Sequence, residues 1–253
     1  MKKMQFKDYL IDNFMPYTIA ILYAVIILVP MYFIFVSSFK QNTEIFTASL
    51  ALPETWDLSN YMKLFSKDLA FNLGNATYNS IFITVSAEIV TLIFAFPAAF
   101  AIARIRTKLA PVVESIFGFG FLIPAFTVML PIFLLMANFG LLYNPLALIL
   151  FYPATRMPIS VLILSGFLRQ IPQDIEDSAV LDGASPLQML RHIFFPLALP
   201  GVVTVVILNF ITFWNEFLFA LILLNNESRT IQIALSTLKG VRVVNYGMIS
   251  AGV

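Results

Sequence analysis

The sequence has no cysteine, a single histidine and few charged residues. Without cysteine the chain forms no disulfide and has no thiolate for catalysis or metal binding. The one histidine, His192, leaves no histidine cluster for a metal or a haem. Charged residues make up 11% of the 253 residues, against about 25% in ordinary soluble domains. So few charges cannot cover a soluble surface, and the composition therefore indicates an integral membrane protein.

Nucleotide-binding and nucleic-acid-binding signatures are also missing. No G-x-x-x-x-G-K-[ST] loop occurs, so the chain is not expected to bind or hydrolyse ATP itself. Fifteen basic residues face 14 acidic ones without a basic run, which gives no sign of nucleic-acid binding. We therefore predict a non-catalytic protein that holds no cofactor and no metal of its own.

Long apolar runs dominate what is present. A spanning helix needs about 20 apolar residues, and five runs qualify: Thr18–Phe39, Asn79–Ala103, Ser115–Ala137, Leu146–Leu168 and Ala198–Leu224. Turn signals at Asn138-Phe139-Gly140 and Tyr143-Asn144-Pro145 separate the third run from the fourth. A sixth apolar stretch opens near Tyr246, and we expect it to be a truncated last span. The predicted fold is an all-α, polytopic transmembrane helical bundle.

The basic residues orient the predicted spans, because lysine and arginine near span ends favour the cytoplasm. A cytoplasmic N-terminus places the larger basic set inside: Lys2, Lys3, Lys7, Arg104, Arg106, Lys108, Arg169 and Arg191. The smaller set then lies outside: Lys40, Lys63, Lys67, Arg229, Lys239 and Arg242. The predicted organisation is a cytoplasmic N-terminus at 1–16, a retained first span at 17–39, an extracytoplasmic loop at 40–78 and a core at 79–253. Within the loop, Asp57–Phe65 fits a short amphipathic helix, either at the membrane interface or as a landing surface for an extracytoplasmic partner.

One polar segment, Pro172–Pro196, lies between the fourth and fifth runs on the predicted cytoplasmic side. Pro172 suits the first turn of a helix, where no backbone donor is needed. Three acidic residues follow it and complement the positive end of the helix dipole: Asp174, Glu176 and Asp177. Ile175, Ala179 and Val180 give this helix a small apolar side.

The same segment carries signals for a sharp turn and a second helix. Gly183 can take the left-handed conformation that ends a helix. Ser185 then fits an N-cap followed by Pro186, and Gln188 completes a capping box. From these residues alone, helix–glycine–helix indicates either a docking element for another protein or a plain interfacial loop.

This segment resembles the EAA loop of permeases from binding-protein-dependent ABC importers. The family motif runs E-A-A, three residues, glycine, nine residues and I-x-L-P. Here it reads Asp177-Ser178-Ala179, then Gly183, then Ile193-Phe194-Phe195-Pro196, at the same spacing. The three departures from Glu, Ala and Leu keep the charge, the small volume and the apolar character.

Further strings are similar to the carbohydrate-uptake branch, in particular to the second permease of maltose-type importers. They are Ile171-Pro172, Leu181-Asp182-Gly183-Ala184-Ser185, Ser38-Phe39-Lys40 and Phe213-Trp214-Asn215-Glu216-Phe217. The resemblance covers essentially the whole chain. It implies a type I importer permease of a prokaryotic plasma membrane, with six spans and a carbohydrate as its solute.

The resemblance also implies partners: a cytoplasmic ABC ATPase dimer, a second related permease and an extracytoplasmic solute-binding protein. ATP and Mg would be bound by the ATPase subunits. Residues implied in ATPase coupling are Glu176, Asp177, Ser178, Ala179, Asp182, Gly183, Ala184 and Ser185.

Ionisable residues within the predicted spans form a second candidate site. A charge in a membrane costs about 2.5–3.5 kcal/mol on insertion scales, so it normally faces a pathway or a partner. Glu88 and Arg156 lie near the middle of their spans, and we hypothesise that they pair, either structurally or along the solute pathway. Trp214, Asn215 and Glu216 suit sugar hydroxyls and apolar sugar faces, and a packing or gating role explains them equally.

Three alternatives remain beside the sugar importer permease. The cargo could be another small solute, such as an amino acid, phosphate or a metal ion. A channel or ion-coupled carrier using Glu88 and Arg156 would need no helix–glycine–helix segment. A membrane enzyme acting on lipid-linked substrates would need clustered acids or histidines at one interface, and only Pro172–Pro196 has clustered acids.

Overall fold

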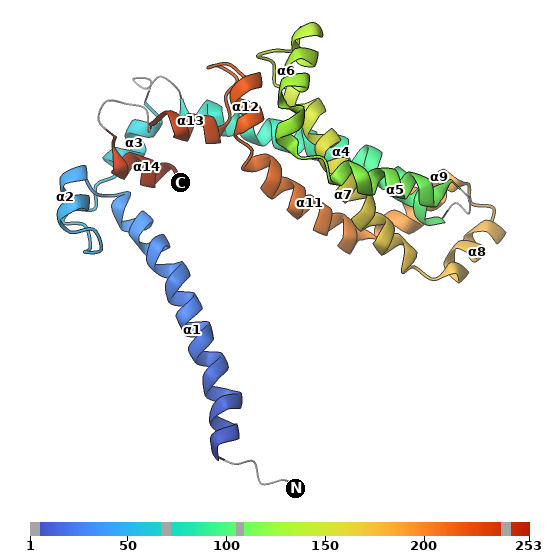
Figure 1. The fold of residues 1–253 in the computed structure, drawn as a ribbon, viewed down its shortest axis with the longest axis horizontal. Helices are drawn as coiled ribbons and strands as arrows, with labels where there is room; N and C mark the ends of the chain where they lie inside the picture. Colours follow the sequence, from blue (N-terminus) through green and yellow to red (C-terminus); the bar gives the residue numbers. More distant parts are fainter. Residues whose placement is uncertain (1–5, 67–71, 105–108, 239–243) are drawn as a thin grey trace. The chain divides into compact units, whose positions relative to one another are not determined.

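The computed structural model describes residues 6–66, 72–104, 109–238 and 244–253, and these are helical or irregular, without a strand. The longer helices (Figure 1) are α1 (Phe6–Ser37), α4 (Leu73–Arg104), α5 (Ala110–Phe121), α6 (Met129–Asn138), α7 (Leu146–Arg169), α8 (Gln173–Leu181) and α11 (Leu199–Trp214). The shorter ones are α2 (Asn42–Thr47), α3 (Ser59–Leu64), η1 (Ala125–Val128), α9 (Pro186–Met189), η2 (Leu190–Phe194), α10 (Phe195–Leu197), α12 (Leu218–Leu223), α13 (Ile231–Thr237) and α14 (Tyr246–Gly252). Of the basic residues used for orientation, Lys2, Lys3, Lys67, Arg106, Lys108, Lys239 and Arg242 lie outside the described residues.

Three described helices are long and apolar enough to cross a membrane: Phe14–Ser37, Leu73–Arg104 and Leu146–Arg169. Two bent helix pairs pass the same test together, so the described residues hold up to five spans if each pair counts as one. The predicted first, second and fourth spans are therefore confirmed as single helices, with ends within a few residues of those expected. The predicted turn between the third and fourth spans is confirmed too, since Gly140 and Tyr143 both have positive φ, 67° and 65°.

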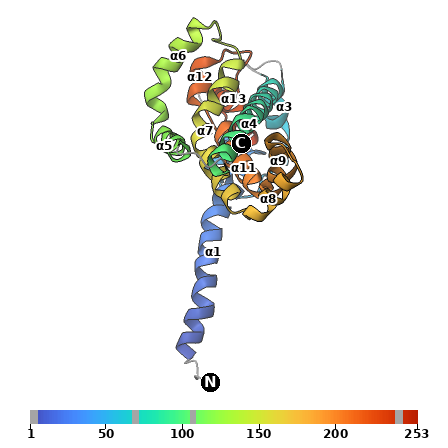
Figure 2. The same cartoon turned by 90° about the vertical axis from the view of Figure 1, so that its right-hand side faces the viewer.

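The predicted third span is not one straight helix. Ala110–Phe121 and Ala125–Asn138 meet at 88°, and Figure 2 shows α6 turning away from α5. Pro124 stands at this break in an extended conformation, immediately before η1. Proline has no backbone donor and clashes with the preceding turn, so a helix ends before it. The fifth predicted span is also divided, because α11 ends at Trp214 and α12 begins at Leu218.

The chain forms two compact units, residues 1–73 with 235–253, and residues 74–234. In the first unit, α14 packs against α1, α2 and α3. Asn42 holds the start of α14 from both sides, since its amide donates to the Val244 carbonyl and its carbonyl accepts from the Tyr246 N–H. Lys40 is fully buried and donates to the carbonyls of Ala48 and Ala51 at 2.7 and 2.6 Å.

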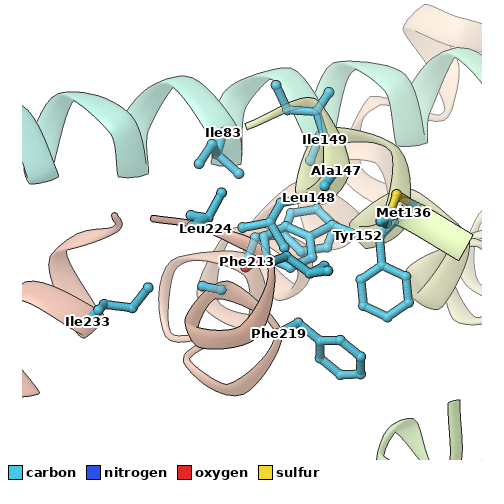
Figure 3. Packing of buried hydrophobic residues seen from close by; sticks show 14 residues of the cluster. Ile83, Met136, Ala147, Leu148, Ile149, Tyr152, Phe213, Phe219, Leu224 and Ile233 are labelled. Carbon is cyan, nitrogen blue, oxygen red and sulfur yellow. The ribbon is translucent and has the colours of Figure 1, made fainter. Parts of the chain in front are cut away.

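The second unit is a bundle in which α5 and α11 pack on α7, and α12 packs on α6 and α7 (Figure 1). Two apolar clusters form its core. The first gathers Ile83 of α4, Leu148 and Tyr152 of α7, Phe213 of α11 and Phe219 of α12, among others (Figure 3). The second joins α4, α7 and α11 to the segment that follows α7, through Ala179, Met189 and Phe194. This second cluster fixes the polar segment to the bundle.

A close approach between α7 and α11 yields the first prediction. A Cβ added at Gly201 would lie 2.6–2.9 Å from Phe167 side-chain atoms, whereas one at Gly166 would meet nothing within 4 Å. Gly201→Ala should therefore force the two helices apart and destabilise the protein by about 1–3 kcal/mol. Gly166→Ala is the matched control and should leave stability unchanged or raise it by about 0.5–1 kcal/mol. Thermal unfolding of the two purified variants in detergent compares them, and equal melting temperatures would contradict this packing.

Candidate functional site

The segment Pro172–Pro196 has most of the local geometry expected from its sequence, but of the predicted apolar side of its first helix only Ala179 is buried, and Ile175 and Val180 are exposed. Pro172 precedes the first residue of α8 in an extended conformation, and α8 ends at Leu181. Gly183 has φ +78°, so the predicted left-handed turn is confirmed. The capping box is confirmed as well, because the Ser185 hydroxyl accepts from the Gln188 N–H and the Gln188 side chain accepts from the Ser185 N–H. These hydrogen bonds join residues of the segment itself and reverse the chain between α8 and α9.

Two sides of α8 differ sharply in exposure. Ala179 is 7% exposed and belongs to the core, whereas Leu181 at its end is 88% exposed. Asp177 and Asp182 are exposed on the outer side. A hollow of about 300 Å³ lies at the turn, lined by Asp182, Gly183, Ala184, Gln188, His192 and Ile193. The outer side of the segment therefore carries the exposed acids, exposed Leu181 and the hollow. Ala179 packs on the core on the opposite side.

The inner half of the segment is anchored by apolar residues. Met189 and Phe194 are buried, and Phe194 lies at the end of the π-helix η2. A bend of 75° separates Pro186–Leu197 from α11. The predicted second helix is thus four residues of α-helix followed by a π-turn, a geometry that is frequent at functional sites.

Glu88, which is buried, and Arg156, which is partly buried, are joined by a residue that the sequence had not singled out. Asn209 of α11 accepts from Arg156 Nε at 3.1 Å and donates to Glu88 Oε1 at 3.5 Å and Ser160 Oγ at 3.1 Å. Among the described residues no salt bridge joins Glu88 to Arg156, so the hypothesised pair is indirect. The only sequence signal for Asn209 is an amide within an otherwise apolar run.

Glu216 closes the break between α11 and α12. Its two carboxylate oxygens accept from the backbone N–H groups of Phe219 and Ala220 at 2.8 and 3.0 Å. The Tyr152 hydroxyl donates a third hydrogen bond to Glu216 at 2.8 Å. A carboxylate at a helix N-terminus satisfies orphan donors and suits the helix dipole, so this side chain has a structural task.

The neighbours of Glu216 are less constrained. The Asn215 side chain is exposed and its amide donates to the Ile211 carbonyl, while the Trp214 ring stacks on Phe210 at 5.7 Å. A cavity of about 510 Å³ lies beside them, with Arg156, Thr212 and Glu216 among its lining residues and apolar side chains from α5 to α12 around them. Glu88 and Asn209 are buried behind its wall.

Comparison with known proteins identifies the architecture. Residues 91–241 match the family of binding-protein-dependent transport system inner membrane components. The chain belongs to this family. It is therefore a multi-pass membrane permease subunit of an ABC transport system.

Individual relatives agree with this assignment. The permease is 32% identical to a diacetylchitobiose uptake system permease protein of Streptomyces coelicolor, over 84% of this chain and 70% of that protein. It is 35% identical to a trehalose transport system permease protein of Mycobacterium tuberculosis, over 77% and 69% of the two chains. Its fold matches a chain of a bacterial ABC transporter involved in the import of the acidic polysaccharide alginate, with a TM-score of 0.85 and 25% identity, over 100% of this chain and 92% of that one.

The second prediction concerns Asn209. Asn209→Leu would leave Glu88, Arg156 and Ser160 of the permease without their common partner, and should destabilise it by about 3 kcal/mol. Thr212→Val on the same helix is the control, because its hydroxyl only bonds back to the Leu208 carbonyl, and its effect should stay within about 0.5 kcal/mol. Melting temperatures in detergent measure both. An Asn209→Leu variant as stable as the control would show that the network contributes nothing.

Proposed function

We propose that this chain is a permease subunit of an ATP-driven carbohydrate importer, forming half of a translocation pathway. The single observation that supports ATP coupling is the outward-facing turn at Gly183. It is held by local hydrogen bonds, bears exposed acids and lines a hollow. The carbohydrate assignment is supported by relatives that are named for diacetylchitobiose and trehalose transport.

The coupling surface in this proposal consists of the outward residues of α8 and the turn after it. Asp177, Asp182 and Leu181 meet a groove on a cytoplasmic ABC ATPase, and Ala179 keeps α8 against the bundle. Glu176, Ser178, Ala184 and Ser185 complete the segment. The ATPase dimer binds ATP and Mg, and its closure moves this segment. Two arrangements of the spans close in free energy are then biased by ligands.

The remaining parts of the proposal are a second related permease, an extracytoplasmic binding protein and a solute pathway. Arg156 and Glu216 line the 510 Å³ cavity and are the candidates for solute contact, together with exposed Asn215 and its neighbour Trp214. Glu88 supports this wall from behind, through Asn209. The N-terminus and the turn at Gly183 lie on the cytoplasmic side in this arrangement.

The third prediction tests docking by a graded series at Gly183. No atom lies within 4 Å of a Cβ there, so substitutions act only through the positive φ. Asn, which tolerates this conformation, should retain the ATPase; Ala strains the backbone by about 1–2 kcal/mol and should retain less. Gly183→Pro cannot adopt φ +78° and should retain none. The measurement is the amount of ATPase that co-purifies with membrane-inserted chain.

Gly166→Ala, an open position on α7, is the control for the series and should co-purify as much ATPase as the parent. Docking through this turn would be refuted by a Gly183→Pro variant that retains the full amount. Uptake of radiolabelled mono- and oligosaccharides by cells then tests the cargo. Uptake of none of them, with intact ATPase binding, would point to another small solute.

The fourth prediction concerns sidedness and uses the absence of cysteine. Leu181→Cys introduces one thiol at a side chain that is 88% exposed. A membrane-impermeant maleimide should label it in inside-out vesicles stripped of the ATPase, which would otherwise cover it, and leave it unlabelled in intact cells or spheroplasts. Ala179→Cys, at a buried position on the same helix, should react slowly in both. Labelling of the residue 181 thiol from outside would overturn the proposed orientation.

A further inference from the structure

Arg104, the last residue of α4, contacts three other elements of the second unit. Its Nη2 donates to the carbonyls of Leu168, in α7, and of Ile171, just after α7, the latter at 2.5 Å. Its Nη1 pairs with Glu176 Oε2 of α8 at 3.4 Å. The Phe194 ring of η2 lies against its guanidinium, with the central carbon 4.8 Å from the ring centroid.

These contacts are made away from water. The Arg104 side chain is 6% exposed and that of Glu176 is 17% exposed. The two accepting carbonyls lie at and just beyond the C-terminal end of α7, and that of Leu168 also accepts from the Ile171 N–H at 3.3 Å. A cation at this end also suits the helix dipole. One guanidinium group therefore contacts the end of α7, the Glu176 carboxyl group of α8 and the Phe194 ring of η2 at the same time.

Only arginine fits this arrangement. Its planar head has several donors in a rigid fork and stacks on rings, whereas lysine has one compact ammonium on a flexible stem. Lysine would keep the charge near Glu176 and lose the simultaneous hold on the two carbonyls and the ring. From the sequence, Arg104 is only one of the basic residues that orient the protein in the membrane. A residue with that role alone would be expected to be exposed.

We propose that Arg104 is the positioning residue that locks α8 to the ends of α4 and α7, so that displacement of the docked segment is carried into the spans as one rigid movement. This inference rests on the proposed docking of an ATPase at Asp177–Ser185. Glu176 and Asp177 then have different roles on one helix. Glu176 faces the bundle and pairs with Arg104, whereas Asp177 is exposed and available to the ATPase.

A second arginine provides a matched control. Arg169, the last residue of α7, makes two hydrogen bonds to Glu114 of α5 at 2.8 and 2.6 Å. Its side chain is 45% exposed, and exposed ion pairs contribute little. Arg169 makes no contact with α8 among the interactions of the described residues. Removing it deletes a cation at the same end of the bundle and leaves the Arg104 contacts in place.

The experiment follows the distance between α7 and α8 in the full chain, assembled with its ATPase in lipid nanodiscs. Spin labels are attached through Leu150→Cys on α7 and Gln173→Cys at the start of α8, both exposed positions in a chain without cysteine and both outside the residues proposed to meet the ATPase. Pulsed electron paramagnetic resonance measures the distance distribution without nucleotide and with ATP plus EDTA, which blocks hydrolysis. ATPase co-purification is measured for every variant.

In the parent chain we expect one narrow distance that ATP does not change, because α8 and the spans move together. In Arg104→Met the distribution should broaden and shift with ATP while the ATPase still co-purifies. Each lost bond to the charged group should lower the ratio of held to released α8 by about tenfold. Arg104→Lys should fall between them, and Arg169→Met should match the parent. Glu176→Leu removes the α8 partner alone and should reproduce the loss if Arg104→Met does not fold.

The outcomes separate the two proposals. An unchanged narrow distance in both Arg104→Met and Glu176→Leu would overturn the role of Arg104. A shift in Arg169→Met equal to that in Arg104→Met would overturn it too, since any cation at this end would then suffice. If no ATPase co-purifies with the parent, the docking proposal fails by itself, and the nucleotide-free distributions still decide whether Arg104 holds α8.

Discussion

A polar or charged group inside an apolar bundle must find its partner within the protein, and the arrangement of residues 74–234 depends on this constraint. Water and lipid tails cannot supply the missing hydrogen bonds. Arg104, Asn209 and Glu216 each satisfy groups from two or more elements. These three side chains therefore tie particular helix ends and faces together, and the two apolar clusters form the core around them.

The broken helices follow the same constraint. Breaking a helix exposes backbone donors and carbonyls that membrane-embedded protein has to satisfy again. At the break after Trp214, the Glu216 carboxylate accepts from two freed N–H groups and the Tyr152 hydroxyl donates to it. At the end of α7, Arg104 donates to the carbonyls of Leu168 and Ile171. Each of these two irregular places in the bundle has an ionisable side chain fitted to it, so Glu216 and Arg104 have a structural explanation before any solute or partner is considered.

The sequence could predict features that depend on neighbouring residues, and it could not predict contacts between residues far apart along the chain. The turn at Gly183 and the capping box of Ser185 and Gln188 depend on residues within a few positions, so their geometry follows from local rules. The single-helix spans follow from the length of their apolar runs. Asn209 joins residues 49 to 121 positions away along the chain, and no periodicity reveals such a contact. The bend before Ala125 did carry a local signal, Pro124, which the uniform hydrophobicity of the run concealed.

The coupling segment shows why a specific motif still leaves its mechanics open. A motif at the right spacing predicts a helix, a glycine turn and exposed acids, and all three are present. It does not indicate which acid faces the bundle, because successive residues of a helix point about 100° apart and the buried side depends on tertiary contacts. Ala179 and Glu176 lie three residues apart, on neighbouring positions of one helix face, and both face inward. Asp177 follows directly after Glu176 and is exposed. A short helix with one face tied to the bundle and the other free is suited to transmit a push, since a segment held on neither face would yield before the spans moved.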